Sequence, residues 1–224
     1  MENILNEILQ PAFWNYFFIL FACMLVFSTI MDVLATRFVT VTRVQRKFTI
    51  FDLEFTATPA ELAGIIKGID KLGDTAWSAR VRKALRLHLL TDFLFMFCVY
   101  PGIAMLCVKT ASKMAGIGEV IFMALAVAQI FAWLFDIIEN VYLLNKLRKP
   151  EISTLKVHKM YKRVVMTKWA IAITGAICSI FGLLYFWIVG EFSRPSAFVP
   201  FIVLAIIIVW AYANNKAMKT FAPK

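Results

Sequence analysis

The sequence is poor in charged and conformationally special residues, and this excludes several classes of protein. Charged residues make up only 17% of its 224 positions, whereas soluble domains contain about 25%. Glycine and proline occur 9 and 7 times, which excludes a flexible linker or a low-complexity chain. Apolar residues reach 61%, above the roughly 45–50% of soluble domains. These proportions are typical of a multi-pass membrane protein.

Cysteine and catalytic motifs are sparse as well. The four cysteines fall in apolar stretches without metal-ligand spacing, so we expect them to pack as small apolar residues: Cys23, Cys98, Cys107 and Cys178. The sequence contains no HExxH motif, no Gly-x-Ser-x-Gly motif and no Cys/His pair of a known catalytic type. It therefore indicates no class of enzyme and assigns no catalytic residue.

Long apolar stretches predict five membrane spans, because about 20 apolar residues cross the hydrocarbon core as a helix. We expect these spans at residues 12–34, 86–108, 120–145, 168–190 and 196–214. The predicted fold class is an all-α membrane protein, a five-helix bundle forming a single transmembrane domain over residues 1–224. A small cytoplasmic insertion of strand and helix is expected at residues 37–84. Residues 1–11 carry Glu2 and Glu7 but no Lys or Arg, so we expect no secretory signal there.

The distribution of positive charge predicts the orientation, because Lys and Arg in loops are retained on the cytoplasmic side. With five spans, residues 37–86, residues 146–168 and the C-terminal tail share one side of the membrane. Of the 24 Lys and Arg residues, all lie on that side except Lys109, Lys113 and Arg194. We therefore expect a multi-pass protein of the inner cell membrane, with its N-terminus outside and its C-terminus in the cytoplasm.

The net charge of +10 is explained by this topology and by contact with anionic lipids. Nucleic acid is not an expected partner, since the basic residues are spread over several juxtamembrane segments instead of one soluble module. The expected partners are the bilayer and its anionic phospholipids, and the sequence is compatible with a homo-oligomer. We expect lipid head groups to contact a basic group before the fourth span: Lys156, Lys159, Lys162 and Arg163.

The insertion at residues 37–84 carries two local signals. Residues 51–56 alternate apolar and polar side chains, which predicts a short surface strand. Thr58, Pro59 and Glu61 then form a helix start, with Thr as N-cap, Pro at the first helical position and Glu able to close a capping box. The insertion is either a lid on the inner membrane face or a connector that lies along it, and we favour the connector.

Ionisable residues inside the spans are the main functional signal, because such residues are rare in membranes. We expect Asp92, Asp136 and Glu139 to form a cation or proton site in the cytoplasmic half of the bundle. Asp136 and Glu139 share a helix face with the alanine stripe at residues 124, 128 and 132, which should face protein. Four polar residues of similar depth are expected to support the site: Asp32, His88, Tyr100 and Asn140.

Two buried carboxylates three residues apart repel each other unless something intervenes. One of them can be protonated, a hard cation such as Mg²⁺, Ca²⁺ or Mn²⁺ can lie between them, or a basic side chain can pair with them. Arg86, Lys168 and His88 have the right depth to be that basic partner. A divalent cation is the one cofactor that these residues would suit.

Proline interrupts the second span. Pro101 and Gly102 lie in its outer half, where proline frees a backbone carbonyl and should kink the helix. The kink can serve as a hinge or only assist packing. Tyr100 beside it can supply a hydroxyl to the freed backbone.

Three segments together carry a resemblance to known sequences: residues 52–62 (DLEFTATPAEL), residues 91–95 (TDFLF) with Tyr100, and residues 136–142 (DIIENVY). In this order they resemble a group of uncharacterised bacterial multi-pass membrane proteins over residues 50–147. The resemblance implies a bacterial membrane origin and no particular chemistry.

Three functions fit these observations. The first is a membrane protein that binds or translocates a cation, a proton or a cationic group at the acidic residues. The second is a membrane-embedded enzyme acting on lipid head groups, for which no catalytic motif is present. The third is a scaffold or assembly subunit in which the polar residues form a purely structural network. The sequence favours the first and leans away from an enzyme.

Overall fold

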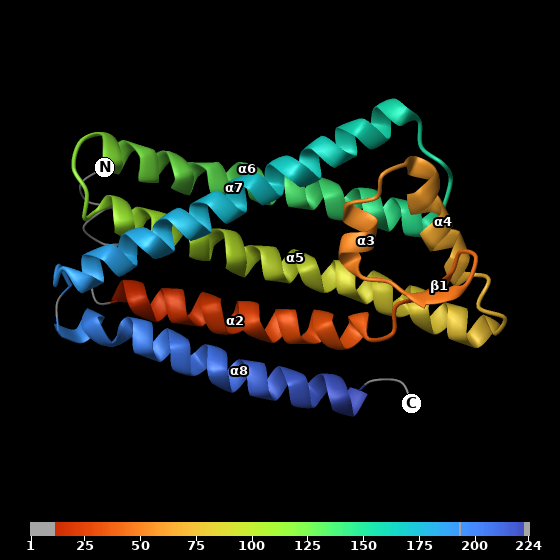
Figure 1. The fold of residues 1–224 in the computed structure, drawn as a ribbon, viewed down its shortest axis with the longest axis horizontal. Coiled ribbons are helices and arrows are strands. Elements are labelled where there is room, and N and C mark those ends of the chain that lie inside the picture. The colour runs from red at the N-terminus through yellow and green to blue at the C-terminus, as the bar shows by residue number, and fades with distance from the viewer. Residues whose placement is uncertain (1–11, 193, 222–224) are drawn as a thin grey trace. The chain divides into compact units, whose positions relative to one another are not determined.

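The computed structural model describes residues 12–192 and 194–221 (Figure 1). Glu2 and Glu7, on which the expectation about a secretory signal depends, lie outside these residues. The described chain is an all-α membrane bundle, which confirms the predicted fold class. Its elements in order are α2 (Ala12–Ala35), β1 (Val39–Val41), β2 (Gln45–Lys47), α3 (Ile50–Glu54), α4 (Pro59–Ile69), α5 (Thr75–Ala111), α6 (Ile117–Arg148), α7 (Leu155–Ile188), a 3₁₀ turn (Arg194–Phe198) and α8 (Val199–Phe221).

Within the described residues, five helices are long and apolar enough to cross a membrane: α2, α5, α6, α7, and α8 with the end of its 3₁₀ turn. Three of them exceed the roughly 20 residues that a crossing requires, with 37, 32 and 34 residues in α5, α6 and α7. The helices continue beyond the expected span limits because Lys and Arg end an apolar stretch but are good helix formers. Each predicted span overlaps one of these helices.

The chain forms two compact units, and every long helix contributes to both. Of the described residues, unit 1 comprises residues 12–26, 95–134, 168–192 and 194–213, and unit 2 comprises residues 27–94, 135–167 and 214–221. Unit 2 thus contains the whole insertion between the first two spans together with one part of each long helix. The two units are described separately below.

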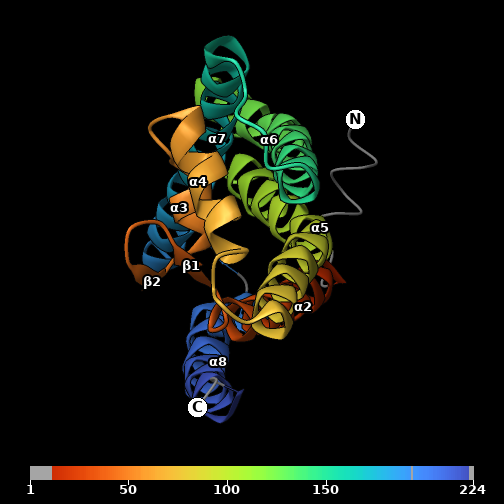
Figure 2. The ribbon, with the colours of Figure 1, turned by 90° about the vertical axis from the view of Figure 1, so that its right-hand side faces the viewer.

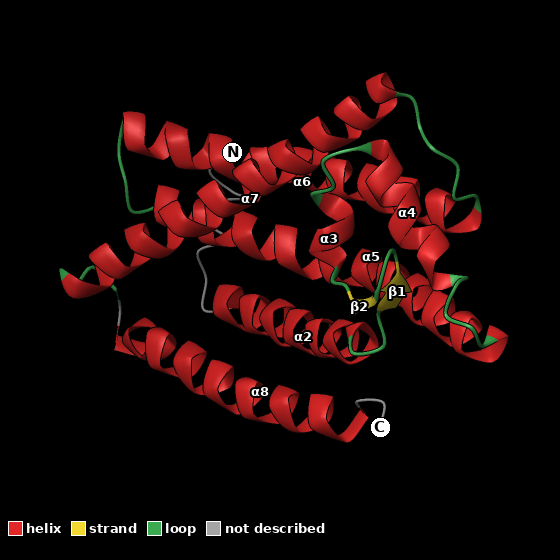
Figure 3. Ribbon diagram, turned by 45° about the vertical axis from the view of Figure 1, so that its right-hand side comes forward, coloured by secondary structure: helices red, strands yellow, loops and turns green. Residues whose placement is uncertain are grey.

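The insertion in unit 2 contains the only strands of the described residues, shown in yellow in Figure 3. β1 and β2 pair antiparallel, with Val39 opposite Lys47 and Val41 opposite Gln45. Figures 1 and 2 both show this hairpin beside α3 and α4. Phe38 and Phe48, which flank the hairpin, are buried and stack with ring centroids 5.3 Å apart. The sheet is therefore a short appendage to a helical core.

Residues 51–56 do not form the strand that their alternation predicted. They lie largely in α3, which begins with a capping box in which the Thr49 hydroxyl accepts from the backbone of Asp52, and the Asp52 carboxylate accepts from the backbone of Thr49. These two local hydrogen bonds favour a helical turn, and the turn buries Leu53. A pattern of four to six residues does not distinguish a strand from such a short helix.

The predicted start of the next helix is confirmed. Thr58 is the N-cap of α4 and its hydroxyl accepts from the backbone N–H of Glu61 at 3.1 Å, with Pro59 in the first helical position. The Glu61 carboxylate reaches back to the backbone N–H of Ala57 at 2.8 Å, one residue before the position of a standard capping box. The apolar face of α4 is then buried, with Leu62, Ile65, Ile66 and Ile69 almost fully enclosed.

One glycine determines how closely α4 approaches β1. A Cβ at Gly68 would overlap the Thr40 hydroxyl and lie 2.6 Å from the carbonyl oxygen of Val41. This contact places the buried Thr40 so that its hydroxyl donates to the carbonyl of Ile65 at 2.7 Å. The close approach satisfies a polar group that would otherwise be costly to bury.

Unit 1 is held together by similar close contacts between its long helices. The Gln129 amide of α6 donates to the carbonyl of Ile171 in α7 at 3.3 Å, and a Cβ at Gly175 would overlap that amide. The Cys107 thiol donates to the carbonyl of Gly175 at 3.5 Å. Small residues and short polar bonds of this kind are typical of helix packing in membranes.

Candidate functional site

The buried acidic residues of α6 lie in unit 2. Asp136 and Glu139 are 6% and 1% exposed, and Asn140 is 2% exposed. The three residues lie within two turns of one helix, so they share a buried face. The expectation that these carboxylates point toward protein agrees with this burial.

The alanine stripe at residues 124, 128 and 132 was predicted to face protein, and this holds only for the alanine nearest the carboxylates. Ala132 is buried, but Ala124 is exposed. Steps of four residues rotate by about 40° each along a helix, so a stripe at every fourth position drifts away from a straight buried face. The buried positions instead combine steps of three and of four residues, through Ala126, Gln129, Ala132, Asp136, Glu139, Leu143 and Leu147.

Asp92 and Asn140 are brought together as expected. The Asn140 amide donates to the Asp92 carboxylate at 2.7 Å and also reaches the carbonyl of Leu89 at 3.4 Å. This links α5 to α6 at the depth of the α6 carboxylates. Asn140 therefore orients the Asp92 carboxylate, which is only partly exposed.

Glu139 faces a group of residues that the sequence did not single out. Glu139 and Glu54, which is 7% exposed, both act electrostatically on the Tyr161 hydroxyl. The ring of Tyr161 stacks on that of Tyr142 with centroids 4.4 Å apart, and its hydroxyl donates to the carbonyl of Leu53 at 3.4 Å. The site therefore includes α3 and α7 as well as α5 and α6.

His158 is a second missed member of this region. It is 3% exposed, and its Nε2 donates to the carbonyl of Thr56 at 3.2 Å. Its Nδ1 is buried and has no hydrogen-bond partner among the described residues. His158 and Tyr161 lie on the buried face of α7 together with Val165 and Lys168, and this spacing of three, four and three residues is the signal that could have identified them.

Asp32 and His88 contact residues outside the pair of Asp92 and Asn140. The Asn214 amide donates to the Asp32 carboxylate at 2.9 Å, which links α8 to α2. His88 donates through Nδ1 to the carbonyl of Met31 at 3.1 Å, packs against Phe38 and lies within the electrostatic reach of Asp32. His88, which lies one turn from Asp92 on α5, thus contacts the end of α2 and the residue Phe38 that follows it.

The other predicted residues are placed as follows. Tyr100 is 5% exposed and belongs to unit 1, as does the buried Lys168, whereas Arg86 is exposed. Pro101 lies within the continuous helix α5. Lys156, Lys159, Lys162 and Arg163 are all exposed, on the side of α7 away from His158 and Tyr161.

The structure gives no support to the prediction that Asp92, Asp136 and Glu139 hold a metal ion. In the part of the chain that the structure describes, no three His, Cys, Asp or Glu side chains are grouped so that they could hold a metal ion. A divalent cation prefers six or more oxygen ligands, several of them from carboxylates.

Comparison of this chain with protein-family models, with curated proteins and with solved structures finds no match.

Proposed function

We propose that this multi-pass membrane protein binds, and through binding translocates, a proton or a cationic group at the carboxylates of Asp136 and Glu139. The observation that carries the proposal is the near-complete burial of these two acids three residues apart on α6. Two carboxylates at this spacing repel each other when both are ionised. A shared proton or a bound cation relieves that repulsion, and ionisable groups inside membranes are functional by default.

Neighbouring groups support an exchangeable site. Asn140 hydrogen-bonds Asp92, and the Tyr161 hydroxyl lies within the electrostatic reach of Glu139, Glu54 and Tyr142. A spatial chain of carboxyl, phenol and imidazole groups is typical of proton relays in membrane proteins. His158, whose Nδ1 is buried, lies near the same aromatic pair, with its ring 6.1 Å from that of Tyr161.

The proposal includes a location. Because the basic residues concentrate on the side that carries the insertion and the C-terminus, unit 2 would face the cytoplasm of a bacterial inner membrane. The exposed basic residues at the start of α7 would then meet anionic phospholipids of the inner leaflet.

Glu139→Gln tests the proposal because it removes the charge and keeps the shape of the side chain. In proteoliposomes of the full chain, with a pH-sensitive dye inside and an imposed potential, we expect proton flux to fall at least about a hundredfold, the lower end of the loss usual for a removed acid–base group. The infrared carbonyl band of protonated carboxyl groups should also decrease. Glu119→Gln, at an exposed position of the same helix, is the matched control and should change neither readout.

The other functions lead to different outcomes. Unchanged flux and an unchanged carbonyl band in a folded Glu139→Gln protein would overturn the proposal. Metal-dependent turnover of a phospholipid would favour the lipid head-group enzyme. A specific co-purifying protein whose binding survives Glu139→Gln would favour the scaffold.

A further inference from the structure

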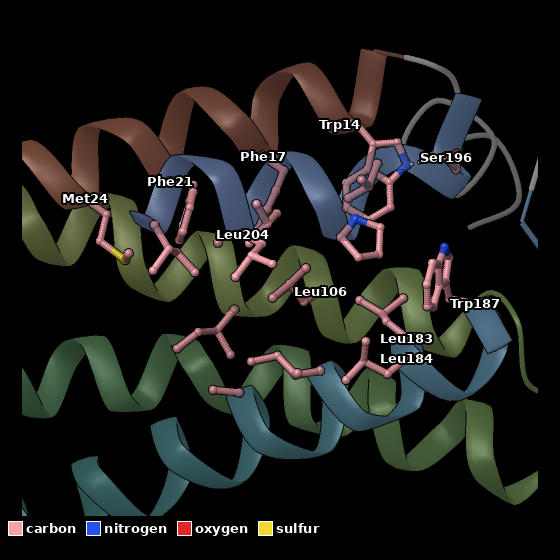
Figure 4. A pocket seen from close by; sticks show the side chains of 18 of the residues that line it. Trp14, Phe17, Phe21, Met24, Leu106, Leu183, Leu184, Trp187, Ser196 and Leu204 are labelled. Atoms are coloured by element: carbon pink, nitrogen blue, oxygen red, sulfur yellow. Dashed lines mark hydrogen bonds between the residues drawn. The ribbon is translucent and has the colours of Figure 1, made fainter. Parts of the chain in front are cut away.

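Unit 1 contains an apolar cavity of about 520 Å³, bounded by α2, α5, α7 and α8 (Figure 4). Its volume is within the range of sites for small ligands, roughly 300–1,000 Å³. Almost every lining group is a hydrocarbon or aromatic side chain, and the wall on α5 includes Gly102, at which an added Cβ would meet nothing within 4 Å. The cavity therefore suits a hydrocarbon ligand.

The cavity is long and narrow in the direction of the helices. On α2 its lining runs from Trp14 to Met24, which is ten residues or about 15 Å of helix. This length equals about half of the roughly 30 Å hydrocarbon core. The cavity thus has the depth of one leaflet, the depth that a phospholipid acyl chain occupies.

One end of the cavity is polar. Figure 4 shows Trp14, Ser196 and Trp187 at this end, where the Trp14 indole donates to the Ser196 hydroxyl at 3.2 Å and the Trp187 indole donates to the carbonyl of Ala197 at 2.8 Å. Tryptophans with one polar edge are enriched where the bilayer meets water. This end is therefore at the membrane interface, at head-group level.

Two lysines lie at the same end. The Lys109 ammonium lies over the rings of Phe13 and Trp14, 5.2 and 6.0 Å from their centroids. The Lys113 ammonium donates to the carbonyl of Glu191 at 2.6 Å and lies 5.4 Å from the ring of Phe192. Trp14 and Phe192 both line the cavity, so each ammonium lies beside a residue of its wall. An ammonium has three donors, which leaves Lys113 able to bind a phosphate oxygen.

We infer that this cavity holds one acyl chain of an anionic phospholipid, with the phosphate beside Lys109 and Lys113. The apolar wall recognises the chain, and the lysines select a head group with net negative charge. The site is in unit 1 and does not depend on the proposed function of the α6 carboxylates. The lipid would be a resident ligand of the leaflet on the Trp14 side.

Native mass spectrometry of the full chain in mild detergent tests the inference, with phosphatidylglycerol and phosphatidylcholine of identical acyl chains as probes. We expect one phosphatidylglycerol to be retained, and more tightly than phosphatidylcholine. Gly102→Leu, which fills the cavity, should lower the affinity for both lipids by about tenfold. This loss is equivalent to about two methylene groups that are no longer buried. Gly102→Ala is the matched control, because a single methyl group leaves most of the volume open.

A second set of variants tests whether Lys109 and Lys113 recognise the lipid head group. Lys109→Met with Lys113→Met should remove the preference for phosphatidylglycerol, by about fivefold per lysine, and should weaken phosphatidylcholine binding less, because that head group has no net charge. Lys67→Met with Lys71→Met, at exposed positions of unit 2, is the control and should leave the preference intact. Circular dichroism and the melting temperature establish that each variant is folded.

Equal binding of the two lipids by the unmodified chain would overturn the inference. So would undiminished binding by folded Gly102→Leu, or a preference that is lost with Lys67 and Lys71 instead of with Lys109 and Lys113. Glu139→Gln should leave lipid binding unaltered, so failure of the proposed function and failure of this inference give different results.

Discussion

At the scale of single residues, a few side chains and one missing side chain determine how unit 2 is built. Gly68 allows α4 to approach β1, and the approach brings the Thr40 hydroxyl to the carbonyl of Ile65. A side chain at Gly68 would have to displace backbone atoms of β1, which are held by pairing with β2. The absence of a Cβ is therefore a structural requirement at this position.

Gly68→Ala should destabilise the protein by about 1–3 kcal/mol, the usual cost of overpacking a rigid site. Gly64→Ala on the same helix is the control, because a Cβ there meets nothing within 4 Å, and it should stabilise by about 0.5–1 kcal/mol through helix propensity. Thermal unfolding of both variants in the same detergent measures the difference. An equal effect of the two substitutions would contradict the close contact at Gly68.

At the scale of elements, Arg82 of α5 joins the ends of two other helices. Its guanidinium donates to both oxygens of Asp70, the C-cap of α4, at 2.6 and 2.5 Å, and to the carbonyl of Leu147 near the end of α6 at 2.6 Å. A planar guanidinium can donate two parallel hydrogen bonds to a carboxylate, an arrangement called a fork, and an ammonium cannot. The hydrogen bond to Leu147 is part-buried, whereas the ion pair with Asp70 is exposed and is therefore screened by solvent.

Arg82→Lys keeps the charge but loses the fork, and we expect it to loosen the turn after α4. Trypsin should then cleave at the neighbouring exposed Lys71 several-fold faster. Arg80→Lys is the matched control, since Arg80 is exposed and its contact with Asp74 is 3.9 Å long. Equal cleavage rates in the two variants would show that the fork does not hold the turn.

At the scale of the whole molecule, the charge distribution predicts which segments share a side of the membrane. The insertion and the start of α7 should face the cytoplasm, and the connection between α5 and α6 should face outward. Glu61 and Glu119 are exposed residues of the two sides.

In intact cells, a membrane-impermeant thiol reagent should label Glu119→Cys and not Glu61→Cys, and permeabilised cells should give labelling of both. The four native cysteines lie within the spans and are free, so they are replaced in the background. Labelling of Glu61→Cys before permeabilisation would reverse the predicted orientation.

Local signals in the sequence were sufficient for some features and insufficient for others. The start of α4 at Thr58 and Pro59 was predictable because its hydrogen bonds join residues three or four positions apart. Residues 51–56 were misassigned because a short alternation fits a strand and a capped turn equally well, and the capping box at Thr49 decides between them. The pairing of Asp92 with Asn140 was predictable from their common depth in the membrane, whereas the hydrogen bond of His88 to the carbonyl of Met31 was not.

The sequence by itself determined that the chain crosses a membrane five times as helices. The thickness of the bilayer sets the length of an apolar span, and the lack of water in the hydrocarbon core requires the backbone of that span to make its hydrogen bonds internally, as a helix does. It also identified the ionisable residues within the spans, since their rarity is visible without coordinates. Only the tertiary structure decided which of them meet, that Glu54 and Tyr161 adjoin Glu139, and that an apolar cavity opens beside Gly102. Those features depend on helix rotation and on contacts between residues far apart in the chain, about which local periodicity carries no information.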